Sequence, residues 1–176
     1  MKRFVTVIFS CFALLIAYCS AAASPPESVD PSLIVNYRVS APGVATAGLI
    51  TPQGMTQLKA LGFRTILNLR TEQEGAKDEE AAVKAHGLRY EWVPVTAASL
   101  SLEDVKKVEK VLEDPNAAPV LFHCASANRV GAIWAILLVQ RGNPLETALE
   151  KGREIGLKDG PMTAAVERLV GTGATP

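Results

Sequence analysis

The segment from His123 to Arg129 has the sequence HCASANR, in which four residues separate a thiol from a guanidinium. Cys124 can supply a thiolate nucleophile, and Arg129 can hold two oxygens of an oxyanion with its forked donors. Small or polar residues between them let backbone N–H groups converge on the same anion: Ala125, Ser126, Ala127 and Asn128. This segment therefore predicts a site that binds and processes an oxyanion.

Apolar runs on both sides of the segment predict a strand–loop–helix unit that would position it. Residues 119–122 are compact and apolar, as a central parallel strand is. Residues 130–140 are nearly uncharged and predict a buried helix. Ligands of open α/β sheets bind at the carboxyl ends of the strands, and a helix N-terminus there favours the thiolate form of Cys124, as does Arg129.

The rest of the chain alternates strand and helix patterns, which predicts a single α/β domain with a mostly parallel sheet flanked by helices. Strands are expected at residues 44–47, 65–69 and 88–95, and helices at 51–61, 78–86, 101–112, 144–154 and 162–170. The predicted domain spans residues 43–170. A proline-containing tether is expected at 24–42 and a frayed tail at 171–176.

The first 23 residues are typical of an export signal. Lys2 and Arg3 precede an uncharged apolar run at 4–17, and small residues at 21–23 offer a cleavage site. We expect a periplasmic or secreted protein cleaved near Ala23. An uncleaved anchor and, less favoured, a lipid anchor through Cys19 are the alternatives.

Charge and cysteine content narrow the function classes. The chain has 18 basic and 18 acidic residues, and loss of Lys2 and Arg3 would leave 16 against 18, a net charge of −2. This balance argues against a protein that coats nucleic acid. Cleavage would also leave Cys124 as the only thiol, with no internal disulfide. With two histidines in the chain, no metal-site spacing is found and no cofactor is predicted.

A family resemblance rests on the HCxxxxR segment together with TPQG at 51–54, ILNLR at 66–70 and VPVT at 93–96. Over about residues 38–155 the chain resembles the beta-lactamase-hydrolase-like phosphatases. This family is a branch of the tyrosine and dual-specificity phosphatase fold, and some of its members are labelled sulfurtransferases. The resemblance implies that Cys124 is the nucleophile, that Arg129 and the loop amides bind the oxyanion, and that His123 orients or tunes the thiolate.

Three departures from ordinary cysteine phosphatases affect this interpretation. Four residues rather than five separate Cys124 from Arg129, which is also the spacing of rhodanese-type loops. Related sequences have glycine where this chain has Ala127, and a left-handed alanine costs on the order of 1–2 kcal/mol. The loop at 96–100 contains no aspartate to protonate a leaving group, which predicts slow phosphatase turnover.

Three hypotheses follow: an exported cysteine-dependent phosphatase, a sulfurtransferase that carries a persulfide on Cys124, and a catalytically weak module that binds oxyanions. The expected partner is a small oxyanion or a phosphorylated substrate, with no nucleic acid and, after signal cleavage, no membrane. Arg70 is predicted to add positive charge at the rim of the site, with a solvated strand-end arginine as the alternative. Both catalytic hypotheses require a reachable thiolate near neutral pH.

Overall fold

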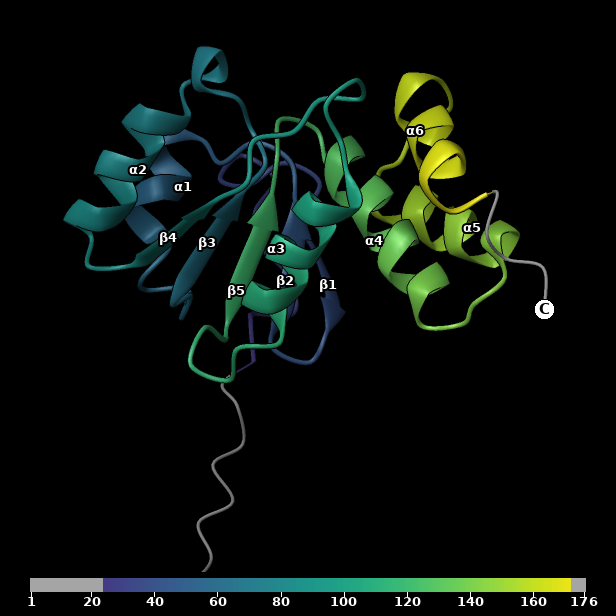
Figure 1. Ribbon diagram of the computed structural model, residues 1–176. Helices are drawn as coiled ribbons and strands as arrows, with labels where there is room; N and C mark the ends of the chain where they lie inside the picture. The colour runs from purple at the N-terminus through teal and green to yellow at the C-terminus, as the bar shows by residue number, and fades with distance from the viewer. Residues whose placement is uncertain (1–23, 172–176) are drawn as a thin grey trace, which may run out of the picture.

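The computed structural model describes residues 24–171, which form a five-stranded sheet in the order β1-β2-β5-β3-β4 (Figure 1). Neighbouring strands pair in parallel, except that β1 is antiparallel to β2 at one edge. The strands are β1 (Arg38–Ala41), β2 (Val44–Ala47), β3 (Thr65–Asn68), β4 (Arg89–Trp92) and β5 (Val120–His123). The predicted single α/β domain with a mostly parallel sheet is confirmed. The predicted signal at 1–23, and the tail beyond residue 171, lie outside the described residues.

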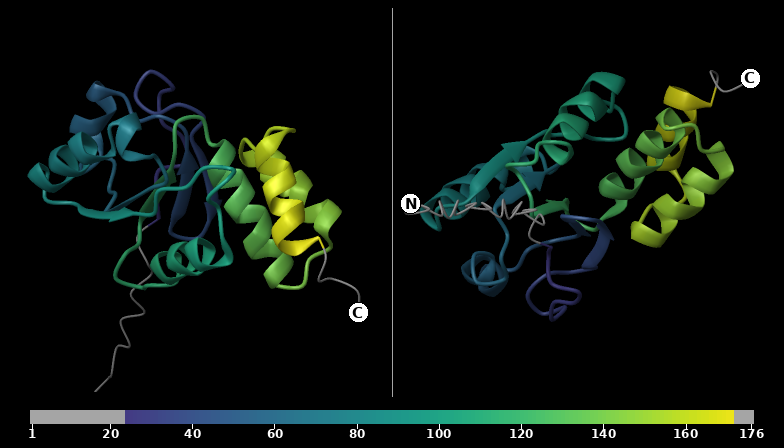
Figure 2. Two further views of the ribbon diagram at one scale, coloured as in Figure 1. Left: turned by 45° about the horizontal axis from the view of Figure 1, so that its top comes forward. Right: turned by 90° about the horizontal axis from the view of Figure 1, so that it is seen from below.

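Helices cover both faces of the sheet because the central strands are apolar on both sides (Figure 2). Ile66 and Leu121 belong to the core on one face, whereas Leu67 and Phe122 belong to the core on the other. The first face carries α1 (Pro52–Gln57) and α2 (Ala76–Ala85); the second carries α3 (Leu102–Leu112), α4 (Asn128–Gln140), α5 (Leu145–Ile155) and α6 (Pro161–Val170). A 3₁₀ turn, η1 (Glu72–Glu74), precedes α2.

The strand register brings the predicted site to one edge of the sheet. His123 at the end of β5 is level with Ala47 of β2 and with Asn68 of β3, and Asn68 is level with Trp92 of β4. Four parallel strands therefore end together, and the loops that follow them can meet above this edge.

Some boundaries differ from the sequence-based expectations. The segment 24–42, expected to be a tether, contains β1 and the fully buried Ile34, so the folded domain begins before residue 43. Helix α1 ends at Gln57, earlier than expected, and turns follow it. Strand β4 ends at Trp92, two residues before Pro94, because proline cannot donate to a ladder.

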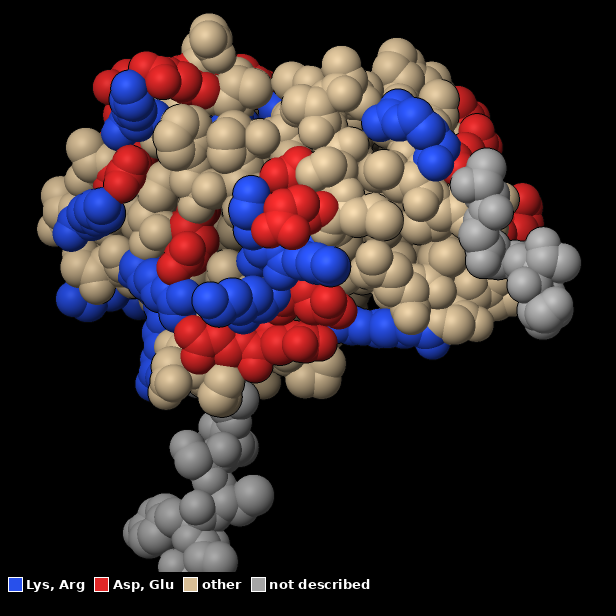
Figure 3. Space-filling view, viewed as in Figure 1, with Lys and Arg blue, Asp and Glu red and all other residues tan. Residues whose placement is uncertain are grey.

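The surface around α3 carries basic and acidic side chains in alternation (Figure 3). Arg89 pairs with both Glu91 and Asp114, and Arg141 pairs with Glu109 and Glu113. The cations of this face are thus largely neutralised by neighbouring carboxylates. Within residues 24–171, no helix has the length and apolar character needed to span a membrane.

Candidate active site

Cys124 lies directly after β5, at the start of the loop that leads into α4. Its backbone N–H donates to the carbonyl of Ala47 at 3.3 Å, which continues the β2–β5 ladder by one residue. Only 1% of Cys124 is exposed. The thiol is therefore at the predicted strand–helix junction but is much more buried than the sequence indicated.

The loop after Cys124 turns sharply at Ala127, whose φ of 66° is left-handed. This is the conformation in which alanine is strained, and it places Ala127 as the N-cap of α4, with its carbonyl accepting from Gly131. Ser126 forms an isolated bridge with Gly48, where a Cβ would lie 3.2 Å from the Ser126 Cα. The loop is thus held against the segment that follows β2.

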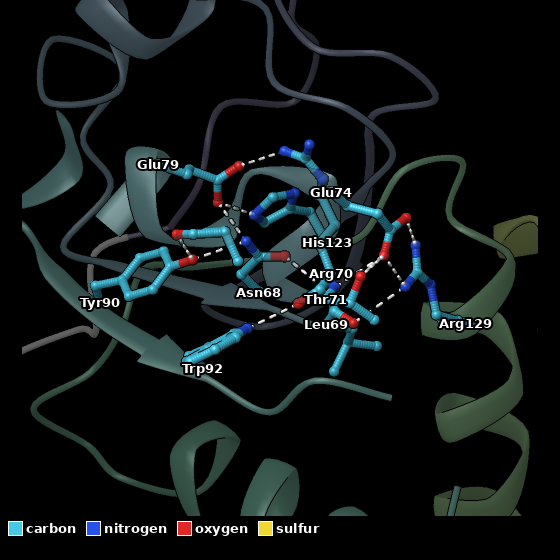
Figure 4. Close-up of polar contacts among 11 residues, drawn as sticks. Asn68, Leu69, Arg70, Thr71, Glu74, Glu79, Tyr90, Trp92, His123 and Arg129 are labelled. Atoms are coloured by element: carbon cyan, nitrogen blue, oxygen red, sulfur yellow. Dashed lines mark hydrogen bonds and ion pairs between the residues drawn. The ribbon is translucent and has the colours of Figure 1, made fainter. Parts of the chain in front are cut away.

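Arg129, in the first turn of α4, makes a two-pronged ion pair with Glu74 (Figure 4). Its Nη1 and Nη2 donate to the two carboxylate oxygens at 2.7 and 2.6 Å, and Nη1 also donates to the carbonyls of Leu69 and Val95 at 3.2 Å. The hydrogen bonds that Arg129 makes within residues 24–171 use Nη1 and Nη2, so its Nε donor remains for an oxyanion. Glu74 therefore orients the guanidinium without using all of its donors.

The ion pair fixes the charges of both partners. The hydrogen bond from Arg129 lowers the pKa of Glu74 to about 2, against an opposing effect of burial. Burial also disfavours the charged form of Arg129, but Glu74 and the neighbouring Cys124 sulfur outweigh it and raise the pKa of Arg129. Glu74 is consequently ionised at neutral pH and is unsuited to protonate a leaving group.

A depression of about 460 Å³ opens beside Arg129. Its lining residues come from four segments that converge at this edge of the sheet: Thr71, Glu74, Thr96, Ala97, Ser126, Asn128, Arg129 and Met162. Arg129 and Glu74 are the charged residues of this lining. Within residues 24–171, no group of three or more His, Cys, Asp or Glu side chains is arranged to hold a metal ion.

His123 belongs to a buried polar network that includes Glu79 (Figure 4). Cys124, the next residue, instead packs in the core on the other face of the sheet. Its Nε2 lies 2.8 Å from Oε1 of Glu79, whose other oxygen accepts from Arg70 at 3.0 Å. Asn68 donates to Glu79 and to the Tyr90 hydroxyl oxygen, both at 2.8 Å. Burial raises the pKa of Glu79, but His123 and Arg70 outweigh burial and lower it. Since a carboxylate only accepts, Nε2 carries the proton.

The structure brings some of the predicted residues together. Ser126, Asn128 and Arg129 line the depression, whereas Cys124 is buried and is not among its lining residues. Arg70 and His123 are instead both bound to Glu79. Asn128 lines the depression, but its Oδ1 accepts from the backbone N–H of Lys158 at 2.9 Å. That bond ties the loop to the connection between α5 and α6.

Glu74 and Glu79 were not among the site residues predicted from the sequence. A signal for Glu79 was present: Ala76, Glu79 and Val83 fall at helical spacing on the buried side of α2. For Glu74 the signal was weaker, because its capping box with Thr71 accounts for the residue without reference to Arg129.

A family model described as "Beta-lactamase hydrolase-like protein, phosphatase-like domain" matches residues 36–141, more than half of the chain and the whole Cys–Arg loop. The chain belongs to this family. A beta-lactamase hydrolase-like protein from Xylella fastidiosa strain 9a5c is 30% identical over 113 residues, which cover 61% of this chain and 26% of that protein. The phosphatase-like domain thus spans about a quarter of the length of this relative.

Solved structures share the fold of this phosphatase-like domain. A Shewanella putrefaciens protein described as a putative phosphatase has a TM-score of 0.65 at 23% identity, covering 81% of this chain and 95% of that one. TpbA from P. aeruginosa, in complex with pTyr, has a TM-score of 0.63 at 23% identity, covering 87% and 90%. The catalytic domain of the PP-IP phosphatase SIW14 from S. cerevisiae has a TM-score of 0.62 at 16% identity, covering 81% and 88%.

Proposed function

We propose that this protein is an exported, cysteine-dependent phosphatase-like hydrolase of the tyrosine and dual-specificity class. The Cys124 thiolate attacks phosphorus, an S–P bond forms, and the P–O bond to the leaving group breaks. Water then attacks phosphorus, releases inorganic phosphate and returns the thiolate. Arg129 and the amides of the loop bind the phosphoryl oxygens throughout.

The observation that carries this proposal is the placement of Arg129. Glu74 holds one side of the guanidinium, Cys124 lies close enough to raise the pKa of Arg129, and the Nε donor is left for a ligand. A nucleophile and an oriented oxyanion ligand thus share the N-terminal end of α4. Two proteins of similar fold support a phosphoryl substrate for this chain. TpbA was solved in complex with pTyr, and SIW14 is described as a PP-IP phosphatase.

Slow turnover is part of the proposal. Glu74 is the carboxylate in the lining of the depression, and its ion pair with Arg129 keeps it deprotonated. The leaving oxygen then takes its proton from water. Without a positioned acid, the rate of this step is lower by roughly 10²–10⁴-fold. Esters with good leaving groups are the best substrates for such a site.

Hydrolysis of an aryl phosphate tests the proposal. We expect turnover by the wild-type protein and background rates for Cys124→Ser and for Arg129→Ala, with both variants folded as judged by thermal denaturation. Lys106→Ala, on the exposed side of α3, is a matched control that should keep wild-type turnover. Equal hydrolysis by wild-type protein and Cys124→Ser would refute the proposal.

Sulfur transfer is the second candidate, favoured by the four-residue spacing between Cys124 and Arg129. The thiolate would take the outer sulfur of thiosulfate, release sulfite and pass the sulfur from its persulfide to a thiol acceptor. Mass spectrometry after incubation with thiosulfate should then show an adduct of about 32 Da on Cys124. A protein that hydrolyses aryl phosphate and never carries this adduct excludes the candidate.

A binding module without turnover is the third candidate, favoured by the burial of Cys124. It predicts oxyanion binding that survives Cys124→Ser, together with no product in either assay. The measurement is titration calorimetry with inorganic phosphate on both proteins.

Export is proposed from the sequence of residues 1–23. N-terminal sequencing of protein recovered from the periplasm or medium should give a start near Ser24. A start at Met1 would instead favour a retained anchor.

A further inference from the structure

The lining of the depression beside Arg129 contains two unlike sets of groups. One set is charged or polar and comes from the Cys–Arg loop and η1, including Arg129, Glu74 and Ser126. Met162 and Ala97 form an apolar set, and both also pack in the main hydrophobic core. Met162 is 6% exposed, so its accessible surface is the part that faces this depression.

Internal hydrogen bonds hold the loop that carries Ala97 in one shape. Backbone N–H groups of Thr96 and Ser99 donate to each other's side-chain oxygens at 2.9 and 3.1 Å, and the Leu100 N–H donates to the Thr96 carbonyl at 3.0 Å. Arg168 of α6 donates to the carbonyls of Ala97 and Leu100, both at 3.4 Å. The Ala97 loop and α6, which carries Met162, are therefore fixed to each other.

Helix α6 is also fixed to the Cys–Arg loop. The Asn128 side chain accepts from the Lys158 backbone N–H at 2.9 Å, and the Lys158 carbonyl accepts from the Thr163 hydroxyl at 3.0 Å. Met162 is thus held in the same depression as Arg129 before any ligand arrives. Because these side chains are already ordered, binding an apolar group against them costs little further conformational entropy.

We propose that Met162 and Ala97 determine substrate specificity by contacting the leaving group while Arg129 and the loop amides hold its phosphoryl group. The substrate class is a phosphate monoester whose leaving group is uncharged and apolar. This inference rests on the phosphoryl-binding function proposed above. Met162 and Ala97 are the part of the site that recognises the leaving group.

Charge in the depression supports the same class. Among its lining residues Arg129 is the cation, and the Glu74 carboxylate already neutralises it in part. A substrate with a second phosphate would place that group beside threonine, alanine and methionine, or beside the Glu74 carboxylate. Like charges so placed repel one another, so the lining discriminates against polyphosphorylated ligands.

Titration calorimetry on full-length Cys124→Ser separates the two parts of the site because this variant holds ligand without turnover. The probes are inorganic phosphate, naphthyl phosphate and an inositol polyphosphate. We expect naphthyl phosphate to bind roughly fivefold more tightly than inorganic phosphate, because its ring buries roughly 40 Å² of apolar surface. The polyphosphate should bind no more tightly than inorganic phosphate. Tighter binding of the polyphosphate than of naphthyl phosphate would overturn the proposal.

Met162→Ala, made in the Cys124→Ser protein, should remove the advantage of naphthyl phosphate and leave the Kd for inorganic phosphate within about twofold. Met55→Ala is the matched control, because Met55 is half-buried against the core on the other face of the sheet. Weaker binding of both probes by Met162→Ala would show a purely structural role and overturn the proposal. If neither probe binds to Cys124→Ser, the proposed function itself fails.

Methyl NMR provides a test without a methionine substitution. The chain has three methionines, Met1, Met55 and Met162, so labelled methyl signals are few and can be assigned. Naphthyl phosphate should shift the Met162 methyl by its ring current, whereas inorganic phosphate should not, and Met55 should be unaffected by both. Binding of naphthyl phosphate that leaves the Met162 signal in place would overturn the proposal even if the affinities agree.

Discussion

Two carboxylates five residues apart, Glu74 and Glu79, each neutralise an arginine but do so in different surroundings. Glu74 is about one-third exposed, with 33% of its side-chain surface accessible, and binds Arg129 at the edge of the depression. Glu79 is nearly inaccessible, at 4%, and is shared between Arg70 and His123. The exposed pair leaves donors for a ligand, whereas the buried group is surrounded by its own partners. The two arginines are similarly accessible, at 13% for Arg129 and 16% for Arg70, so the difference lies in their carboxylate partners.

The largest expected difference between Glu74 and Glu79 is the loss of folding stability when each is replaced. Glu79→Ala leaves the fully buried Nε2–H of His123 without an acceptor and removes the partner of Arg70, which should cost about 3–5 kcal/mol of the free energy of unfolding. Glu74→Ala should cost about 1 kcal/mol, because the Glu74 carboxylate is one-third exposed and water can take its place beside Arg129. Urea denaturation of both variants measures this, with Glu80→Ala, exposed on the same helix, as the control. Similar losses for the two variants would remove the distinction.

A second contrast concerns anion binding. Glu74→Gln removes a negative charge next to the ligand-binding arginine, so the Kd for inorganic phosphate should fall by roughly three- to tenfold. Turnover should fall at the same time, because the amide holds the guanidinium less firmly. Glu79→Gln, whose charge is balanced within its own network, should change the phosphate Kd by no more than about twofold. Calorimetry with phosphate decides between these outcomes.

Acid should weaken the Glu74 pair in a defined window. The folded-state pKa of Glu74, about 2, is below its ordinary value of 4.5. Its contribution to stability is therefore complete above pH 4.5 and is lost as the pH falls from 4.5 to about 2. The stability difference between wild-type protein and Glu74→Gln should be constant above this window and shrink within it. A difference that grows on acidification would contradict the assignment.

The smallest expected contrast is in the response to salt. Raising the ionic strength to about 1 M shortens the screening length to about 3 Å, which reaches the partly exposed Glu74–Arg129 pair but not the buried Glu79 network. The destabilisation caused by Glu74→Gln should therefore diminish with added sodium chloride, while that caused by Glu79→Gln stays nearly constant. Parallel changes in the two variants would argue against this difference in screening.

Much of this arrangement was predictable from the sequence, because local patterns dictate it. The apolar run before His123 and the uncharged helix after Arg129 fixed the strand–loop–helix unit, and helical periodicity located α3 to α6. Partners far apart in the sequence were not predictable, since no local pattern indicates that Glu74 reaches Arg129 or that Glu79 reaches His123. Arg70 was misplaced for the same reason: its position after β3 was expected, but its partner on α2 was not.

Ala127 has a consequence for which substitutions the domain tolerates. A Cβ added at Gly156, at the end of α5, would lie 2.9 Å from the Ala127 Cβ, and Gly156 itself has a φ of 143°. Ala127→Gly would remove that obstacle and the strain of a left-handed alanine together. The methyl group of Ala127 fits because residue 156 has no side chain, and the φ of Gly156 disfavours a side chain there whatever residue 127 is. A substitution at Gly156, in the distant α5–α6 connection, is therefore expected to disturb the Cys–Arg loop.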